Sequence, residues 1–359
     1  MKNTVVKCLN MSDIIEQHIK QYPKIQARDV LKLLYQSEYG VGHLISSEGD
    51  SLRYLQEELC MELPVLCEDR PYIEEIGNGY VRVYLQAIKD GKISETTFHW
   101  MFLKSAEGKP GSKEIFLEKV QEVAKLCEQY SINIMEELGK WDSENESPFR
   151  HSEVYREAYR PAYRVMRKEY IRFWDLFCKI DEKCASQDKV VIAIDGNSAA
   201  GKSSLSKLLQ LVYDCDVIAM DHFFLQPHQR TSERFNEAGG NIDYERFNEE
   251  VIAKLIQEEV FSYAPLLCEN FQFGEPVKVH NKKVCVVEGS YSTHPKFGQY
   301  YDLSVFLAVE SEEQVKRIMQ RNGEKCLEFF VNRWIPMERK YFEAFDIKGR
   351  CDLIYSLLC

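Results

Sequence analysis

Several features are missing from this 359-residue sequence, and each absence excludes a class of protein. No uncharged apolar run approaches the ~18 residues that a membrane-spanning helix needs. Residues 1–13 contain no apolar stretch long enough for a secretory signal peptide. The composition is 45% hydrophobic and 29% charged, which is ordinary for a folded protein and excludes a disordered or collagen-like chain. We therefore expect a cytoplasmic protein with no membrane partner.

The 12 cysteines do not form a metal-binding pattern. No pair is spaced Cys-x-x-Cys, and the closest pairs, Cys60 with Cys67 and Cys178 with Cys184, lack the spacing of a zinc site. Most cysteines lie in apolar surroundings, as Cys285 does between valines. We expect reduced, buried thiols in a reducing compartment.

The sequence also has no excess of positive charge. Its 46 Lys and Arg residues are outnumbered by 57 Asp and Glu residues, which gives a formal net charge of −11. Binding along a nucleic-acid backbone needs a positive surface, so we expect no nucleic-acid partner. A local basic pocket for a nucleotide is compatible with this charge, and the sequence leaves homo-oligomerisation open.

The length suggests two domains, and the first half has a helical pattern. Apolar residues recur at helical spacing around residues 14–19, 30–35, 52–59 and 116–127. A further helical stretch covers about 152–183, with Pro161 in its first third, where the helix would kink or restart. No segment alternates as a strand does. We therefore expect residues 1–184 to form an all-α N-terminal domain of unknown role.

Strands and helices alternate from residue 185 onward. Short runs rich in β-branched residues at 190–194, 217–220, 284–287, 303–307 and 351–355 predict buried strands. Helical patterns at 203–213, 244–259, 311–321 and 325–345 lie between them. This alternation predicts right-handed crossovers and an α/β domain over residues 185–359 with a mostly parallel sheet.

A phosphate-binding loop follows the first of these strands. Residues 196–203 match G-x-x-x-x-G-K-[ST] at every fixed position, between a strand and a helix. The loop N–H groups would face a phosphate chain, Lys202 would reach its β- and γ-phosphates, and Ser203 would ligate Mg²⁺. The expected nucleotide-binding residues are Gly196, Asn197, Ser198, Ala199, Ala200, Gly201, Lys202, Ser203 and Ser204. The loop alone does not separate a kinase from a GTPase, a motor or a transporter ATPase.

Two carboxylates stand at the ends of later strands, where ligands of open α/β sheets bind. Asp221 follows the second strand and would accept a proton from an attacking hydroxyl, hold Mg²⁺ through water, or both. Glu288 ends the third strand and would help to hold metal-bound water beside the loop. The alternatives are a turn-forming Asp and a helix-capping Glu.

Four segments in order resemble the uridine kinase and phosphoribulokinase family: residues 190–209, 220–224, 241–247 and 286–289. The resemblance covers about residues 187–359 and implies ATP- and Mg²⁺-dependent phosphoryl transfer to a hydroxyl of a small molecule, with a nucleoside, uridine, as the first candidate. It places the acceptor hydroxyl at Asp221, metal ligation at Asp221, Ser203 and Glu288, and the lid cations at Arg317 and Arg321. Together with the polar segment 225–240, it gives as substrate-binding residues Asp221, Phe224, Arg230, Asn241, Asp243, Tyr244 and Arg333.

The sequence departs from that family where the nucleoside would be read. Tyr244 replaces the family's histidine, and residues 265–274 lack its Tyr-Asp pair and its His-x-Arg. Another small alcohol therefore stays open as the acceptor, as in relatives that phosphorylate pantothenate or nicotinamide riboside. A second alternative is an ATP-dependent switch without an acceptor. The lid cations have an alternative as well, a solvated basic face of a helix.

Two features of the N-terminal half have a functional and a structural interpretation. Glu38 and His43 would form an acid–base or ligand pair, but Gly40 and Gly42 between them favour a capping turn. Basic residues spaced by four from Arg156 to Arg172 would form a stripe on one helix beside tyrosines. This stripe would bind an anion, or it would be the outer face of an amphipathic helix whose tyrosines pack inward. We favour the amphipathic helix.

Overall fold

The structure is a computed structural model that describes residues 10–40, 47–63, 72–107, 111–145, 147–257 and 260–356. The chain divides into two compact units, Met1–Cys178 and Lys179–Cys359. The boundary falls inside helix α10 (Trp174–Ser186). Among the described helices, none is both long and apolar enough to cross a membrane.

Unit 1 combines helices with a three-stranded antiparallel sheet. Strands β1 (Ile73–Gly77), β2 (Tyr80–Tyr84) and β3 (Tyr163–Arg167) pair in that order. Helices α1 and α2 contact β1, and α5 contacts β3. The helices are α1 (Met11–Gln21), α2 (Ala27–Tyr39), α3 (Glu48–Cys60), α4 (Gln86–Lys89), α5 (Glu95–Ala106), α6 (Lys113–Gln129), α7 (Ile134–Leu138), α8 (Glu153–Tyr159) and α9 (Lys168–Ile171).

The sheet corrects the prediction of an all-α N-terminal domain. Its β1–β2 turn contains Asn78 and Gly79, both with positive φ (52° and 77°). Asn-Gly between two strands is a strong local signal for a tight hairpin. Strand β2 departs from the half-buried pattern of a surface strand, because Arg82 between the buried Val81 and Val83 is buried as well.

The stretch predicted as helical over 152–183 is helical at both ends, in α8 and α10, and breaks at Pro161 as expected, but strand β3 interrupts it. Helix α8 ends at Tyr159, and the capping residue Arg160 adopts the left-handed conformation with φ 42°. Pro161 follows, and proline lacks the N–H that a continuing helix needs and disfavours helical geometry before it. The chain then enters β3, so the basic residues from Arg156 to Arg172 do not share one helical face. Arg164 instead makes a two-pronged ion pair with Glu58, at 2.9 and 3.1 Å.

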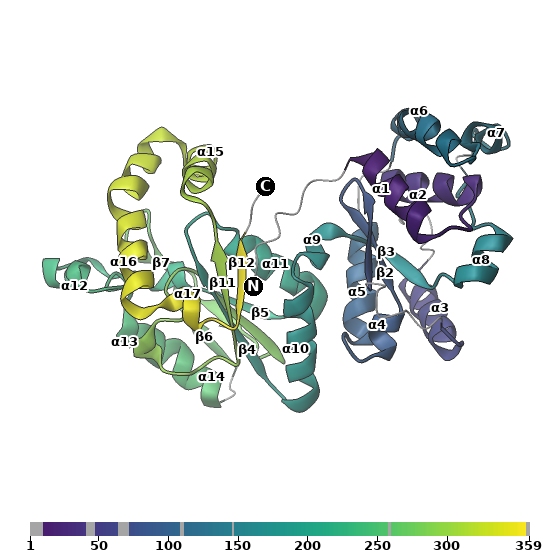
Figure 1. Cartoon of the computed structure of the whole chain (residues 1–359). Coiled ribbons are helices and arrows are strands. Elements are labelled where there is room, and N and C mark those ends of the chain that lie inside the picture. Colours follow the sequence, from purple (N-terminus) through teal and green to yellow (C-terminus); the bar gives the residue numbers. More distant parts are fainter. Residues whose placement is uncertain are drawn as a thin grey trace. The chain divides into compact units, whose positions relative to one another are not determined.

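Unit 2 contains the predicted parallel sheet, and all five predicted strands are confirmed. They are β4 (Val190–Gly196), β5 (Asp216–Ala219), β10 (Val284–Glu288), β11 (Leu303–Ala308) and β12 (Leu353–Ser356). The order is β12-β11-β4-β10-β5 and every pair is parallel. Every residue of β4 is buried, as expected of a central strand covered on both faces. Figure 1 shows α10 and α11 on one side of this sheet and α16 and α17 on the other.

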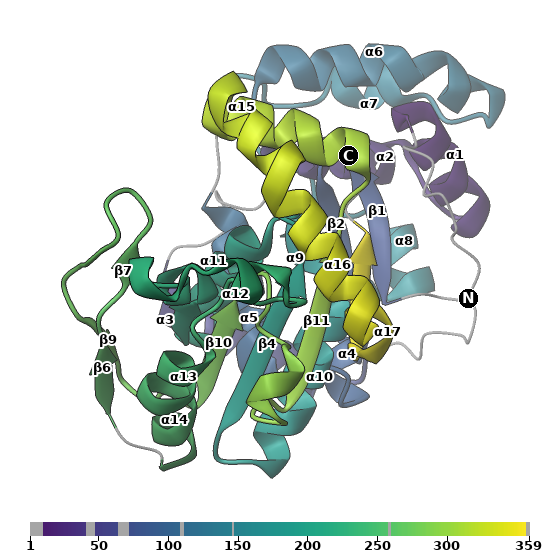
Figure 2. The same cartoon turned by 90° about the vertical axis from the view of Figure 1, so that its left-hand side faces the viewer.

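The remaining helices and short strands of unit 2 connect the strands of this sheet. The helices are α11 (Lys202–Tyr213), α12 (Ser232–Asn236), α13 (Tyr244–Phe247), α14 (Ala253–Gln257), α15 (Ser311–Phe329), α16 (Ile335–Phe345) and α17 (Ile347–Arg350). Two small ribbons, β6 (Phe261–Tyr263) with β9 (Val277–Val279) and β7 (Leu266–Leu267) with β8 (Gln272–Phe273), were not predicted. Figure 2 shows them on the β10 side of the sheet, away from β11.

Candidate functional site

The loop after β4 has the backbone geometry of a tight phosphate-binding turn. Gly196 has φ 134°, and a Cβ at this position would lie 2.1 Å from the carbonyl oxygen of Leu307 on the neighbouring strand. Gly201 has φ 94° and precedes the first residue of α11. Helix α11 therefore begins at the loop, with its free N–H groups turned toward the space above it.

The side chain of Lys202 folds back against the loop and is held by backbone carbonyl groups of the loop. Its Nζ donates to the carbonyl oxygens of Gly196 and Asn197, each at 2.8 Å, and to the hydroxyl of Ser290 at 3.2 Å. The side chain is buried. The ammonium group is thus fixed where a phosphate chain lying on the loop would meet it.

Three oxygen-bearing side chains converge beside Lys202. The Ser203 hydroxyl donates to Glu288 Oε1 at 2.9 Å. Burial, with a further contribution from the charge of Asp221, raises the pKa of Glu288 above its ordinary value, against the lowering effects of Ser203 and Lys202. Asp221 lies in a 3₁₀ turn, Met220–Phe223, directly after β5 and is exposed. This set contains two carboxylates and a hydroxyl with excess negative charge.

Hard oxygen donors of this kind fit Mg²⁺, which binds one or two protein carboxylates together with substrate phosphates. Within the described residues no group of three or more His, Cys, Asp or Glu side chains could hold a metal by itself. Ser203, Glu288 and Asp221 would therefore share the ion with a bound nucleotide rather than enclose it.

Two buried carboxylates support the loop, and the sequence analysis missed both. Asp195 accepts hydrogen bonds from the backbone N–H groups of Gly196, Tyr291 and Thr293 and from the hydroxyl of Tyr341. Its position directly before Gly196 at a strand end was a usable signal.

Glu338 of α16 is the second. It accepts from the Ser198 N–H and hydroxyl, both at 3.1 Å, and from the Ser290 hydroxyl at 2.8 Å. Burial raises the pKa of Glu338 despite the nearby Lys202. No local motif marks Glu338, because only the fold brings α16 to the loop.

A cavity of 670 Å³ opens above the loop, and most of the predicted site residues line it. It joins the loop from Ser198 to Ser204 to the two strand-end carboxylates, Asp221 and Glu288. The other predicted residues in its wall are Phe224, Arg230, Asn241, Arg317 and Arg321. Residues not predicted also line it, including Cys268, Phe271, Ser290, Tyr291, Phe330, Trp334 and Glu338.

The far wall of the cavity carries aromatic rings and one free amide oxygen. Phe224 and Trp334 stack with centroids 6.3 Å apart and an interplanar angle of 19°. The Arg230 guanidinium lies over the Phe271 ring at 4.7 Å. Asn241 is buried, and its Oδ1 has no hydrogen-bond partner in the described part of the chain. A planar ligand with a hydrogen-bond donor would satisfy these groups.

Helix α15 brings two cations to the same cavity. Arg317 pairs with Glu313 at 2.8 Å, and its Nη1 lies 3.5 Å from the Ala199 carbonyl oxygen of the loop. Arg321 lies one turn further along. Gly323, with φ 77° and ψ 173°, interrupts the helix just beyond them.

Three of the residues predicted to bind substrate are absent from the described lining of the cavity. Asp243 is buried, caps α13 by accepting from the Arg246 N–H, and accepts from Gln226. Tyr244 is a buried core residue whose hydroxyl donates to the Gly239 carbonyl oxygen. Arg333 packs over Phe235 and Trp334, at 4.4 and 5.2 Å. The first two support the cavity wall from behind.

In unit 1, Glu38 takes part in a structural ion pair. Lys119 donates to its Oε2 at 2.7 Å and the Ser112 N–H to its Oε1 at 3.0 Å. Gly40 ends α2 with φ 58°, as the capping interpretation predicts. His43 and Gly42 lie outside the described residues, so the Glu38–His43 pair remains a sequence-based prediction.

No family model and no curated protein matches the chain. Among solved structures it is similar to a possible uridine kinase from Bacillus stearothermophilus (18% identity, TM-score 0.38), covering 50% of this chain and 99% of that one. It is also similar to shikimate kinase from Bacteroides thetaiotaomicron (16%, 0.23, covering 46% and 86%) and to deoxyadenosine kinase from M. mycoides (14%, 0.23, covering 47% and 90%). What this chain binds must follow from its own residues.

Proposed function

We propose that unit 2 transfers the γ-phosphoryl group of ATP to a hydroxyl group of a small molecule. The observation that carries the proposal is the single cavity that holds the loop around Lys202, the Ser203–Glu288 pair and Asp221. A phosphoryl-transfer site needs these parts within reach of one ligand: a phosphate cradle, oxygen ligands for Mg²⁺ and a group that accepts a proton.

Each residue has a distinct task in this proposal. Lys202 and the loop N–H groups bind the phosphates, and Ser203, Glu288 and Asp221 would hold Mg²⁺, which supplies charge neutralisation when bound. Asp221 is also placed to orient the acceptor hydroxyl and take its proton, since it is exposed at the cavity wall. Arg317 and Arg321 approach from α15 and neutralise charge that develops during transfer.

The acceptor that we propose first is a nucleoside, with uridine as the leading candidate. The stacked Phe224 and Trp334 offer a flat aromatic surface to a base, and Asn241 Oδ1 offers an acceptor for a base or sugar N–H or O–H. Tyr244 is not at the cavity, so base recognition would rest on other residues than in the family that the sequence resembles. Pantothenate and nicotinamide riboside are the alternative acceptors.

A panel of small alcohols tests the acceptor. ATP consumption by the full chain is measured with uridine, cytidine, nicotinamide riboside and pantothenate. We expect stimulation by a nucleoside. Stimulation by pantothenate alone would overturn the nucleoside assignment and leave the reaction type standing.

The variant Asp221→Asn separates a kinase from an ATP-dependent switch. We expect Asp221→Asn to lower turnover by about 100-fold or more while ATP affinity is kept. Asp188→Asn, an exposed carboxylate outside the cavity, is the matched control and should match the wild type. An unchanged turnover of Asp221→Asn would favour the switch.

A further inference from the structure

A second cavity, of 380 Å³, lies in unit 1 and is lined by basic side chains. Lys32 comes from α2, Arg156 from α8, and Arg160 from the residue that ends α8. Arg150, His151 and Pro161 complete the described lining, which contains four cationic side chains and no carboxylate. A volume of this size is in the range of small-molecule sites.

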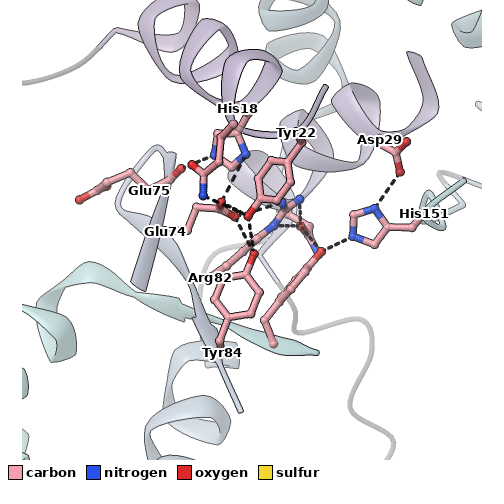
Figure 3. Close-up of polar contacts among 11 residues, drawn as sticks. His18, Tyr22, Asp29, Glu74, Glu75, Arg82, Tyr84 and His151 are labelled. Carbon is pink, nitrogen blue, oxygen red and sulfur yellow. Dashed lines mark hydrogen bonds and ion pairs between the residues drawn. The ribbon is translucent and has the colours of Figure 1, made fainter. Parts of the chain in front are cut away.

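The wall at His151 is rigid and uncharged. His151 Nδ1 bonds to Asp29 Oδ1 at 2.8 Å and Nε2 to the Tyr163 hydroxyl at 2.7 Å. Its ring stacks on Tyr155 with centroids 4.4 Å apart. Burial lowers the pKa of His151 to about 4, so the imidazole is neutral at physiological pH. Figure 3 shows His151 between Asp29 and the buried polar network around Arg82.

The nearest carboxylate is already used by this wall. Asp29 accepts from His151, from the Ser152 N–H and hydroxyl at 3.0 and 2.7 Å, and from the Gln26 N–H at 3.0 Å. Arg82, behind the cavity, is partnered by Gln36 and Glu74. The charges of Asp29 and Arg82 are therefore both compensated by hydrogen bonds and ion pairs within the fold.

The clustering of positive charge affects the pKa of Lys32. Burial lowers its pKa to about 8, and the charges of Arg82, Arg156 and Arg150 add to the effect, against the opposing charge of Asp29. No ion pair of Lys32, Arg150 or Arg156 with a carboxylate occurs among the described residues, whereas Arg160 has only a distant one to Glu62, at 3.9 Å. The cations converge on a space that lacks a counter-charge.

We propose that this cavity binds the phosphate group of a small phosphate monoester, with Lys32, Arg150 and Arg156 as its ligands. A dianion matches several unpaired cations better than a carboxylate does, and guanidinium groups bind phosphate oxygens in pairs. The rest of the molecule would occupy the space toward Arg160 and Pro161. The inference stands on unit 1 alone and does not depend on the proposed function of unit 2.

Calorimetric titration of the full chain carrying Lys202→Ala, which removes phosphate binding at the unit 2 loop, with inorganic phosphate, uridine monophosphate and uridine tests this inference. Uridine tests for binding without the phosphate group, and inorganic phosphate distinguishes the free anion from the ester. We expect both phosphate-bearing probes to bind at a site that Lys32→Met or Arg156→Met weakens about tenfold or more. Arg172→Met, an exposed basic residue of the same unit outside the cavity, should leave this binding unchanged.

Proton uptake gives a readout that a merely structural role of Lys32 would not move. A bound anion raises the pKa of Lys32, so at about pH 8.5 binding takes up protons, measured as a dependence of the heat on buffer ionisation enthalpy. Lys32→Met should abolish the uptake. Absence of phosphate binding to the chain carrying only Lys202→Ala at millimolar concentration, or binding equally strong when Lys32→Met is added, would overturn the proposal.

Discussion

At the scale of single residues, Glu288 has a raised pKa and a role in the proposed chemistry. Its pKa is raised chiefly because the carboxylate is buried, with the Asp221 charge adding to the effect. A carboxyl whose pKa is higher in the folded state than in the unfolded chain stabilises the fold at low pH. That stability is lost as pH rises from the ordinary value through the folded value.

Glu288→Gln should therefore have opposite effects on stability and activity. Without metal or nucleotide, we expect the variant at pH 7 to be as stable as the wild type or more so, with a weaker fall of unfolding free energy above about pH 4.5. Turnover should drop about 100-fold or more because a metal ligand is lost. Chemical denaturation across pH and steady-state kinetics measure the two, with the exposed Glu312→Gln as control. Loss of stability together with activity would assign Glu288 a structural role only.

Gly196 allows a test of the loop geometry. Gly196→Ala would place a methyl group against the Leu307 carbonyl oxygen at φ 134°, and we expect a loss of about 3 kcal/mol or more in unfolding free energy. Gly298 also has a backbone conformation that favours glycine (φ 65°, ψ −160°) but open space around it, so Gly298→Ala should carry the backbone strain of about 1–3 kcal/mol without the steric clash and should cost less than Gly196→Ala. Equal costs in the two variants would show that the close approach to β11 does not matter.

At the scale of elements, the parallel strands were predicted and the antiparallel ones were missed. The strands of unit 2 are apolar runs buried on both faces, so their signal is in the sequence itself. In β1 and β2 the buried residues include Glu74 and Arg82, which satisfy one another inside the fold. Arg82 donates to Gln36 of α2 and to Glu74 of β1. Partners this far apart in the chain cannot be found by periodicity, so burial of these charges could not be foreseen.

The residues of the candidate site also fall into those that the sequence predicts and those that only the fold reveals. Lys202, Ser203, Asp221 and Glu288 follow strands directly, and their meeting at one sheet edge follows from topology. Glu338 and Trp334 reach the cavity only because the chain after α15 returns across the loop. Tyr244 and Asp243 were misplaced because a motif gives an order along the chain, whereas burial depends on how α13 packs.

Helix α15 allows a test of the proposed lid cations. Arg321→Met should lower kcat about 100-fold, with ATP affinity nearly unchanged, because the charge is needed in the transition state rather than for binding. Lys325→Met, an exposed cation on the same helix and outside the described cavity wall, serves as control. A higher KM with normal kcat would instead indicate a simple binding contact. Steady-state kinetics with ATP and the best acceptor distinguish these results.

At the scale of the whole molecule, two compact units divide the chain near Cys178, and we propose that each has its own ligand. Mg²⁺ with ADP at about 100 times its dissociation constant should stabilise unit 2 by about 2.7 kcal/mol. We therefore expect calorimetric unfolding with two transitions, of which ADP raises only the one that Gly196→Ala lowers. Lys202→Ala should remove this response. A single transition that shifts as a whole would contradict independent units.

The most direct test of phosphoryl transfer is the stoichiometry of its products. The full chain is incubated with ATP, Mg²⁺ and a nucleoside, and ADP, inorganic phosphate and phosphorylated acceptor are quantified by mass spectrometry and phosphorus NMR. The proposed function predicts one singly phosphorylated acceptor for each ADP formed, with little inorganic phosphate. Equal amounts of ADP and inorganic phosphate, with no phosphorylated product from any acceptor in the panel, would contradict it.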